Sequence, residues 1–272
     1  IVGGVNGLYT FDYSLNYSLG NYSLAFDIGM SGLGTLATTL SPAIQNIWYN
    51  SIGTVYQREG SARSFLGQGE DSGGGVWARV YGSDGSYVPD ASKNNFGGNT
   101  SANFDMSGIG LDAGVGYAFN QQFVAGAILG TSDTDVTPES GGEATVSATS
   151  VGAYVSYLPG NGFYGDLYYR WMDLDGDGTF GNDRIDYQGK AYGFSIEFGY
   201  ALDTASGFRI EPQLQYSDMK VDLDDISYNG TAFVLNDGDS SQLRAGLALS
   251  KDYKADWGKW TPYGALSYID IS

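Results

Sequence analysis

The chain contains no cysteine and no histidine. It therefore has no disulfide framework, no thiolate nucleophile and none of the Cys or His ligands on which most zinc sites depend. Only 13 lysine and arginine residues oppose 31 aspartate and glutamate residues, which gives a net charge of −18. This balance excludes nucleic acid as the expected partner. Plain solubility, or acidic loops that attract divalent cations weakly, fits the charge better.

Long apolar runs are also missing. No stretch of about 18 apolar residues occurs, so the sequence predicts no transmembrane helix. A membrane-spanning β-strand is still compatible with the sequence, because it needs only about 10 residues with apolar side chains at alternate positions. The first ten residues, IVGGVNGLYT, lack the charged start and apolar centre of a signal peptide, and residue 1 is not Met. We interpret the chain as part of a longer protein.

Glycine and tyrosine are abundant, with 42 Gly and 22 Tyr against 6 Pro. This composition favours β-structure with close backbone approaches. In AYGFSIEFGYAL (191–202), large apolar residues alternate with small residues and Glu197. Residues 8–30 alternate too and predict two or three short strands. From residue 73 onward we predict nine strands, at 75–81, 108–119, 123–130, 150–158, 163–171, 191–200, 208–217, 241–250 and 260–271.

The predicted connections differ in length. Two are short, at 159–162 and 205–207, whereas four are long, Gly-rich and acidic, at 82–103, 131–145, 174–189 and 218–238. Short turns on one side and long loops on the other are typical of an outer-membrane barrel.

Charged residues lie on the strand face opposite the apolar residues. They are Arg79, Asp112, Asp166, Arg170, Glu197, Arg209, Glu211 and Arg244. An arginine at the middle of a bilayer costs about 2–4 kcal/mol on a lipid-facing surface, so we predict that these residues line a wet lumen. The alternative is a soluble β-sandwich with the apolar face buried. Strands of 9 to 12 alternating residues favour the barrel, because sandwich strands usually have about 5 or 6.

One segment has helical periodicity. Ser41 and Pro42 fit the cap and the first position of a helix. Ile44, Ile47, Trp48, Ile52 and Val55 then recur at helical spacing, and Gly60 is a suitable end. This predicts one amphipathic helix over about residues 41–60.

The order of several short motifs resembles a known family. After a β-rich junction and one helix come GVWAR, GLDAGVGYAF, SIEFGYAL, FRIEPQLQYS and TPYGALSYID. Over roughly residues 30–272 this order is similar to the autotransporter translocator domain of Gram-negative bacteria, the type V secretion β-barrel. The resemblance implies an all-β fold, an antiparallel transmembrane β-barrel of twelve strands with the helix in its pore. It also implies insertion by the outer-membrane assembly machinery, and export of an N-terminal passenger to the cell surface without a cofactor.

The resemblance divides the chain into three parts. Residues 1–33 are expected to be the end of the passenger, similar to an autochaperone segment. Residues 34–72 are the linker with the pore helix, and residues 73–272 are the barrel. Because single-chain barrels have an even number of strands, and open edges are not viable in lipid, we expect about three more strands C-terminal to the nine. The expected pore-helix residues are Ile44, Asn46, Trp48, Asn50, Arg58 and Glu59.

Other motifs are weaker. DLDGDGTFGNDR (173–184) begins like a calcium loop, but Arg184 stands where a bidentate Glu is needed, so we predict an acidic loop and no metal site. Asn46 and Asn50 are not adjacent, so we do not expect the self-cleavage at an Asn–Asn pair found in some autotransporters. No GxSxG or Walker-type loop occurs, and we predict no catalytic site. Two alternatives remain open, a small plugged porin and a surface adhesin that acts through its acidic loops.

Overall fold

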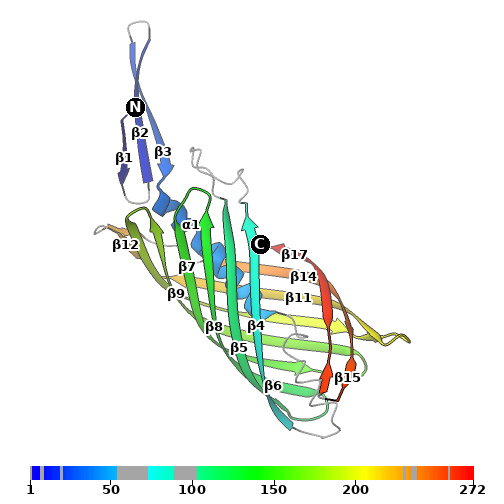
Figure 1. Ribbon diagram of the computed structural model, residues 1–272. Coiled ribbons are helices and arrows are strands. Elements are labelled where there is room, and N and C mark those ends of the chain that lie inside the picture. Colours follow the sequence, from blue (N-terminus) through cyan, green and yellow to red (C-terminus); the bar gives the residue numbers. More distant parts are fainter. Residues whose placement is uncertain are drawn as a thin grey trace.

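The computed structural model describes residues 2–6, 9–18, 21–53, 73–88, 103–228, 231–233, 238–256 and 258–272. One long antiparallel sheet curls around a single helix, and a small sheet stands beyond one end of it (Figure 1). The concave side of the curled sheet faces the helix, and the buried side chains lie between the two.

The large sheet is a simple meander. Its strands are β4 (Gly73–Tyr87), β5 (Phe104–Ala118), β6 (Phe123–Pro138), β7 (Glu143–Tyr157), β8 (Phe163–Phe180), β9 (Asp183–Tyr200), β11 (Phe208–Leu223), β14 (Gly238–Lys251) and β17 (Tyr263–Ile271). Each of them pairs with the strand next to it in this order, and the short β10 (Leu202–Asp203) pairs with β11. Among the described strands, β4 and β17 are the two edges. All nine predicted strands are therefore present.

The predicted long loops at 131–145 and 174–189 are wrong. The strands continue through most of both segments, and only residues 139–142 and 181–182 remain as turns. Gly141, Gly142 and Gly181 have positive φ values, which favour glycine and allow these tight reversals. Asp173, Asp175 and Asp177, which begin the calcium-like motif, lie on β8 and not in a loop.

Two other predicted loops are partly described. Strand β4 continues to Tyr87, and residues 89–102 lie outside the described residues. The connection after β11 contains the small hairpin of β12 (Ile226–Tyr228) and β13 (Thr231–Phe233). At the opposite end of the large sheet, β15 (Tyr253–Ala255) and β16 (Gly258–Trp260) form a second hairpin.

The N-terminal segment forms a separate three-stranded antiparallel sheet. Strands β1 (Val2–Asn6), β2 (Tyr9–Ser18) and β3 (Asn21–Met30) pair in that order. The predicted strands within residues 8–30 are thus confirmed. We call the end of the large sheet nearest to this small sheet the stalk end, and the opposite end the turn end (Figure 1).

Helix α1 (Gly32–Ile52) begins earlier than predicted. Ser31 caps it, because the Ser31 Oγ accepts a hydrogen bond from the backbone N–H of Gly34 at 3.1 Å, and Pro42 lies inside the helix. The helix ends at Ile52, and Gly53 follows with a φ of 52°. The predicted helix over 41–60 therefore starts too late and is confirmed over residues 41–52, whereas residues 54–60, with Arg58 and Glu59, lie outside the described residues. In the part of the chain that the structure describes, no helix is long and apolar enough to cross a membrane.

Candidate pore site

The convex face of the sheet carries a belt of exposed apolar side chains. On β9 it runs from Tyr192 to Tyr200, and Phe198 within it is 49% exposed. Leu129 on β6 is 67% exposed. A soluble sandwich buries such a face, so this arrangement contradicts that alternative. The apolar run on β9, from Tyr192 to Tyr200, has the length of about 9–11 residues that a tilted strand needs to cross a bilayer.

Toward the stalk end the convex face becomes polar. Cross-strand hydrogen bonds join its side chains: Ser147 Oγ donates to Asp133 at 2.6 Å, and Thr145 Oγ1 donates to Asp135 at 2.8 Å. On the next strand pair, Gln188 Nε2 donates to a carboxylate oxygen of Asp175 at 2.9 Å. The strands therefore extend past the apolar belt with a surface suited to water. Among the described residues, no group of three or more acidic side chains is arranged to hold a metal ion.

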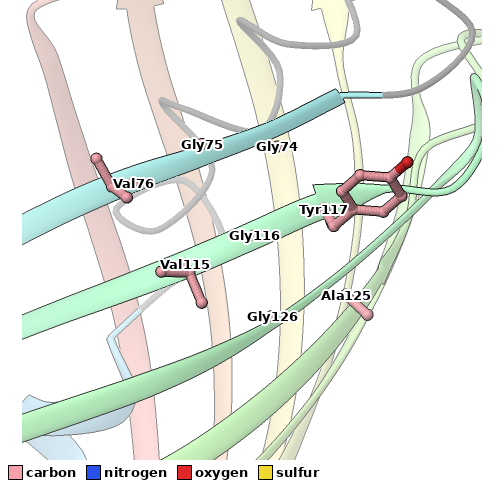
Figure 2. Close-up of a pocket in the computed structure, with 8 residues that line it drawn as sticks. All are labelled: Gly74, Gly75, Val76, Val115, Gly116, Tyr117, Ala125 and Gly126. Carbon is pink, nitrogen blue, oxygen red and sulfur yellow. The ribbon is translucent and has the colours of Figure 1, made fainter.

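A shallow groove of about 470 Å³ lies at the turn end of β4, β5 and β6. Figure 2 shows the side chains of Val76, Val115, Tyr117 and Ala125 on this surface, with glycines between them. Val76, Val115 and Tyr117 are exposed members of the apolar belt. The groove is therefore part of that belt, and the described residues of its lining include no carboxylate or amine.

The concave face near the stalk end is apolar. The first half of α1 places Leu33, Leu36 and Leu40 against this wall, and all three are buried. The wall consists of buried side chains from β6 to β11: Val136, Val146, Leu174, Ile185, Tyr187, Met219 and Val221. Burial raises the pKa of the Tyr187 phenol, with smaller contributions from Asp177 and Asp175. We call this region the dry zone.

Nearer the turn end, charged side chains replace the apolar ones on the concave face. Asp112 is 1% exposed and pairs with two arginines, Arg79 Nη2 at 2.6 Å and Arg170 Nη2 at 2.5 Å. Arg79 is the cross-strand neighbour of Asp112, but Arg170 reaches it from β8, across β7 and β6. We call these three residues the Asp112 cluster.

A second charged group lies on β8, β9, β11 and β14. Glu197 is fully buried and accepts hydrogen bonds from Arg244 Nη2 at 3.1 Å, Gln215 Nε2 at 3.2 Å and the Tyr164 hydroxyl at 3.0 Å. Arg244 Nε in turn donates to Gln215 Oε1 at 2.8 Å. We call these four residues the Glu197 cluster.

Both clusters contact the end of α1. Arg79 Nη2 donates to the backbone carbonyl of Ser51, and Gln215 Nε2 donates to the carbonyl of Gly53 at 3.0 Å. The last carbonyls of a helix have no partner within the helix, and its C-terminus carries a partial negative charge. A cation and an amide donor from the sheet therefore stabilise this end of the helix. The helix is held by apolar packing at its first half and by polar contacts at its C-terminus.

The other predicted pore residues occupy different positions. Asp166 is buried and accepts a hydrogen bond from Ser156 Oγ at 2.6 Å, and Glu211 is also buried. Arg209 lies at the rim of the turn end, where its side chain is 31% exposed and pairs with Asp203 at 2.8 Å. It therefore does not join the clusters around the helix end.

The predicted helix residues also separate into two groups. Ile44 and Trp48 are buried against the sheet. Asn46 and Asn50 are partly buried, and Asn50 Nδ2 donates to both the backbone carbonyl and the side-chain oxygen of Asn46 at 2.8 Å. Ser83 on β4 donates to the same Asn46 side-chain oxygen at 3.0 Å.

Sequence reasoning missed several members of the site. Gln215 and Tyr164 belong to the Glu197 cluster, and Gln213 accepts from Arg244 at 3.4 Å. Gln213 and Gln215 alternate in step with the predicted Glu211 along β11, so the period of two is sufficient to find them. By contrast, no sequence pattern predicts that the backbone carbonyls of Ser51 and Gly53 accept hydrogen bonds from the sheet.

Comparison with known proteins agrees with this architecture. The family model described as "Autotransporter beta-domain" matches residues 76–270, which is more than half of the chain. This chain belongs to the autotransporter β-domain family. The resemblance inferred from the sequence motifs is thus confirmed.

Two curated proteins illustrate the relationship. The chain is 30% identical over 217 residues to the probable autotransporter YcgV of Escherichia coli K12, covering 74% of this chain and 21% of that protein. It is 26% identical over 254 residues to the pertactin autotransporter of Bordetella parapertussis, covering 89% of this chain and 25% of that protein. The chain therefore spans only about a fifth to a quarter of the length of these relatives.

The crystal structure of the β-domain of the Bordetella autotransporter BrkA has the same fold. It superposes with a TM-score of 0.59 at 21% sequence identity, covering 73% of this chain and 80% of the BrkA chain. This likeness supports the curled antiparallel sheet described above as the fold of the chain.

Proposed function

We propose that this autotransporter β-domain is an outer-membrane translocator that anchors an N-terminal passenger and exports it to the cell surface. One observation carries the proposal: α1 lies on the concave side of a sheet whose convex face is apolar, and its N-terminus continues directly into the small sheet outside the stalk end. A chain that leads from the interior of a membrane barrel to a folded segment beyond its mouth has the path of an exported segment. Residues 1–33 then correspond to the end of the passenger.

The membrane supports this arrangement chemically. Lipid in contact with the convex belt removes its exposed apolar side chains from water, which stabilises the inserted state by about 25 cal/mol per Å² of apolar surface. The edges of β4 and β17 need partners in lipid, because unpaired backbone groups there cost several kcal/mol each. We therefore propose that further strands close the barrel, and that the outer-membrane assembly machinery inserts it.

The helix has a defined part in this function. After export, α1 occupies the lumen and obstructs it, with the dry zone toward the cell surface. The Asp112 cluster and the Glu197 cluster fix the helix end within the barrel. Anchoring and obstruction of this kind require packing and hydrogen bonds, and no cofactor takes part.

The two alternative functions are less well supported. A plugged porin accounts for the helix, but gives no role to the sheet that β1, β2 and β3 form at its N-terminus. An adhesin that acts through long acidic loops conflicts with the strand structure of residues 131–138 and 174–180. Family membership also favours the translocator.

Passenger export tests the proposal directly. The full-length protein is produced in a Gram-negative host with an epitope upstream of Ile1, and intact cells are probed with an antibody to it. The proposal predicts surface exposure of the epitope, and its loss when the hairpin of β8 and β9 is deleted. An epitope that stays inside the cell with an intact, folded barrel contradicts export.

A further inference from the structure

The cations of this acidic chain are unevenly placed. Three of its lysines, Lys251, Lys254 and Lys259, lie within one connection at the turn end, between β14 and β17. Residues 251–262 contain these three cations and two acids, Asp252 and Asp256, so their net charge is +1. At the stalk end the convex face instead carries many carboxylates on β6 to β9, among them Asp133, Asp135, Asp173 and Asp175.

Aromatic rings surround the first of these lysines. The Lys251 ammonium lies 4.5 Å from the centroid of the Phe208 ring and 5.8 Å from that of the Tyr253 ring. Tyr253 and Trp260 stack on each other with their centroids 4.8 Å apart, and both are more than 40% exposed. Exposed aromatic rings beside lysines are the composition that anchors proteins at the boundary between acyl chains and headgroups.

The register of the hairpin brings two further lysines together. Lys254 on β15 is the direct cross-strand partner of Lys259 on β16. Like charges at directly paired positions destabilise a strand pair, and an anion nearby relieves such repulsion. Asp252 accepts a hydrogen bond from Thr261 Oγ1 at 2.7 Å, and the exposed Asp256 lies in the turn of the hairpin. The two acids therefore balance only part of the positive charge.

We infer that this hairpin binds the phosphate headgroup of an anionic phospholipid in the periplasmic leaflet. The choice of leaflet rests on the proposed function, which places the stalk end outside the cell and the turn end at the periplasmic side of the outer membrane. Lys251 and Lys254 contact the phosphate, while Phe208, Tyr253 and Trp260 lie along the upper part of the acyl chains. Basic side chains near an anionic lipid surface attract its headgroups, so we expect these cations to give a preference of about tenfold over a zwitterionic lipid.

Native mass spectrometry of the full-length protein tests this inference. The detergent-solubilised protein is offered equal amounts of phosphatidylglycerol and phosphatidylcholine with identical acyl chains. We expect about tenfold more bound phosphatidylglycerol. The variant K251Q/K254Q/K259Q should lose this preference and bind the two lipids about equally. The control R184Q/K190Q/K220Q removes the same charge at the stalk end and should retain the wild-type preference.

Several results would overturn the inference. Equal binding of the two lipids by the wild type does so, and so does an equal loss of preference in both triple variants. Displacement of the bound lipid by millimolar inorganic phosphate would assign the lysines to free phosphate, and displacement by a soluble acidic peptide would assign them to a protein partner. The epitope assay on the same samples keeps the two proposals apart: lipid preference without export refutes only the translocator, and export without lipid preference refutes only this surface.

Discussion

At the scale of single residues, Asp112 is a buried carboxylate that pairs with two arginines. One carboxylate oxygen contacts Arg79 and the other contacts Arg170. Removal of one partner from a buried ion pair costs about 3–5 kcal/mol, because the remaining charges stay desolvated. The contact of Arg79 with the Ser51 carbonyl makes the end of α1 depend on the same carboxylate.

We predict that Asp112→Asn lowers the free energy of unfolding by about 3–5 kcal/mol, measured by urea unfolding of the detergent-folded protein. The matched control is Asp203→Asn, which also removes one negative charge from a pair with an arginine. Asp203 is 69% exposed, so this control should cost less than about 1 kcal/mol. Similar losses in the two variants would refute the special role of Asp112.

Glycine is required where Arg170 crosses the sheet to reach Asp112. A Cβ atom on Gly130 would lie 2.1 Å from Asp112 Oδ1 and 3.0 Å from Arg170 Nη2. Gly130 is the cross-strand neighbour of Asp112 on β5 and of Ser150 on β7. The missing side chain therefore leaves the space in which the ion pair forms.

Gly130→Ala should displace the carboxylate and lower the unfolding free energy by about 2–5 kcal/mol, since the two charges lose their contact while buried. Gly264→Ala on β17 is the control, because no atom lies within 4 Å of the added Cβ there. Urea unfolding of both variants provides the measurement. An unchanged midpoint for Gly130→Ala would show that the ion pair tolerates a methyl group and does not require glycine at this position.

At the scale of elements, α1 depends on tertiary packing. Its first turns, GLGTLATTL, contain glycine and threonine, which are weak helix formers. Leu33, Leu36 and Leu40 nevertheless recur at helical spacing and are buried in the dry zone. The apolar contacts with the sheet therefore outweigh the low intrinsic propensity of this segment.

Leu36→Ala should destabilise the dry zone by about 2–5 kcal/mol, because Leu36 is fully buried, and should raise the ionic conductance of the protein in planar bilayers. Thr38→Ala is the control on the exposed face of the same helix, where a change of less than about 0.5 kcal/mol is expected. If both variants conduct like the wild type and unfold at the same urea concentration, the dry zone does not seal the lumen.

The same packing explains where sequence reasoning fails. Ser41 and Pro42 have the residue types of a helix start, but the true cap is Ser31, and the intervening turns pack Leu33, Leu36 and Leu40 against the sheet. Past the belt, β6 and β7 continue to alternate, but polar residues now lie on the convex face and apolar residues on the concave face. On β6, for example, Asp135 is exposed and Val136 is buried. The acidic composition of these segments favours a loop, although their period of two is that of a strand.

At the scale of the whole molecule, the period of two predicts the strands well. The residues from Tyr192 to Tyr200 indicate, from their alternation alone, both the convex apolar face and the small concave face. The ion-pair partners are not predictable in this way, because Asp112 and Arg170 lie on strands separated by two others. Their contact requires the curvature of the sheet and the gap at Gly130, neither of which is visible in local sequence.

The molecule is polarised along its axis. The stalk end has an acidic convex face and an apolar interior, whereas the middle has an apolar convex face and a charged interior. This exchange of faces is the change expected where a strand leaves lipid and enters water. We therefore expect the belt to lie in the membrane with the stalk end outside the cell.

Cysteine labelling in intact cells measures this orientation, since the chain has no cysteine of its own. Single variants Asn182→Cys at the stalk end, Gln122→Cys at the turn end and Leu129→Cys in the belt are introduced into the full-length protein, freed of any other cysteine. A membrane-impermeant maleimide should label Asn182→Cys in intact cells and Gln122→Cys only after the outer membrane is permeabilised. Leu129→Cys should react only after unfolding. Rapid labelling of Leu129→Cys in the folded protein, or of Gln122→Cys in intact cells, would contradict this orientation in the membrane.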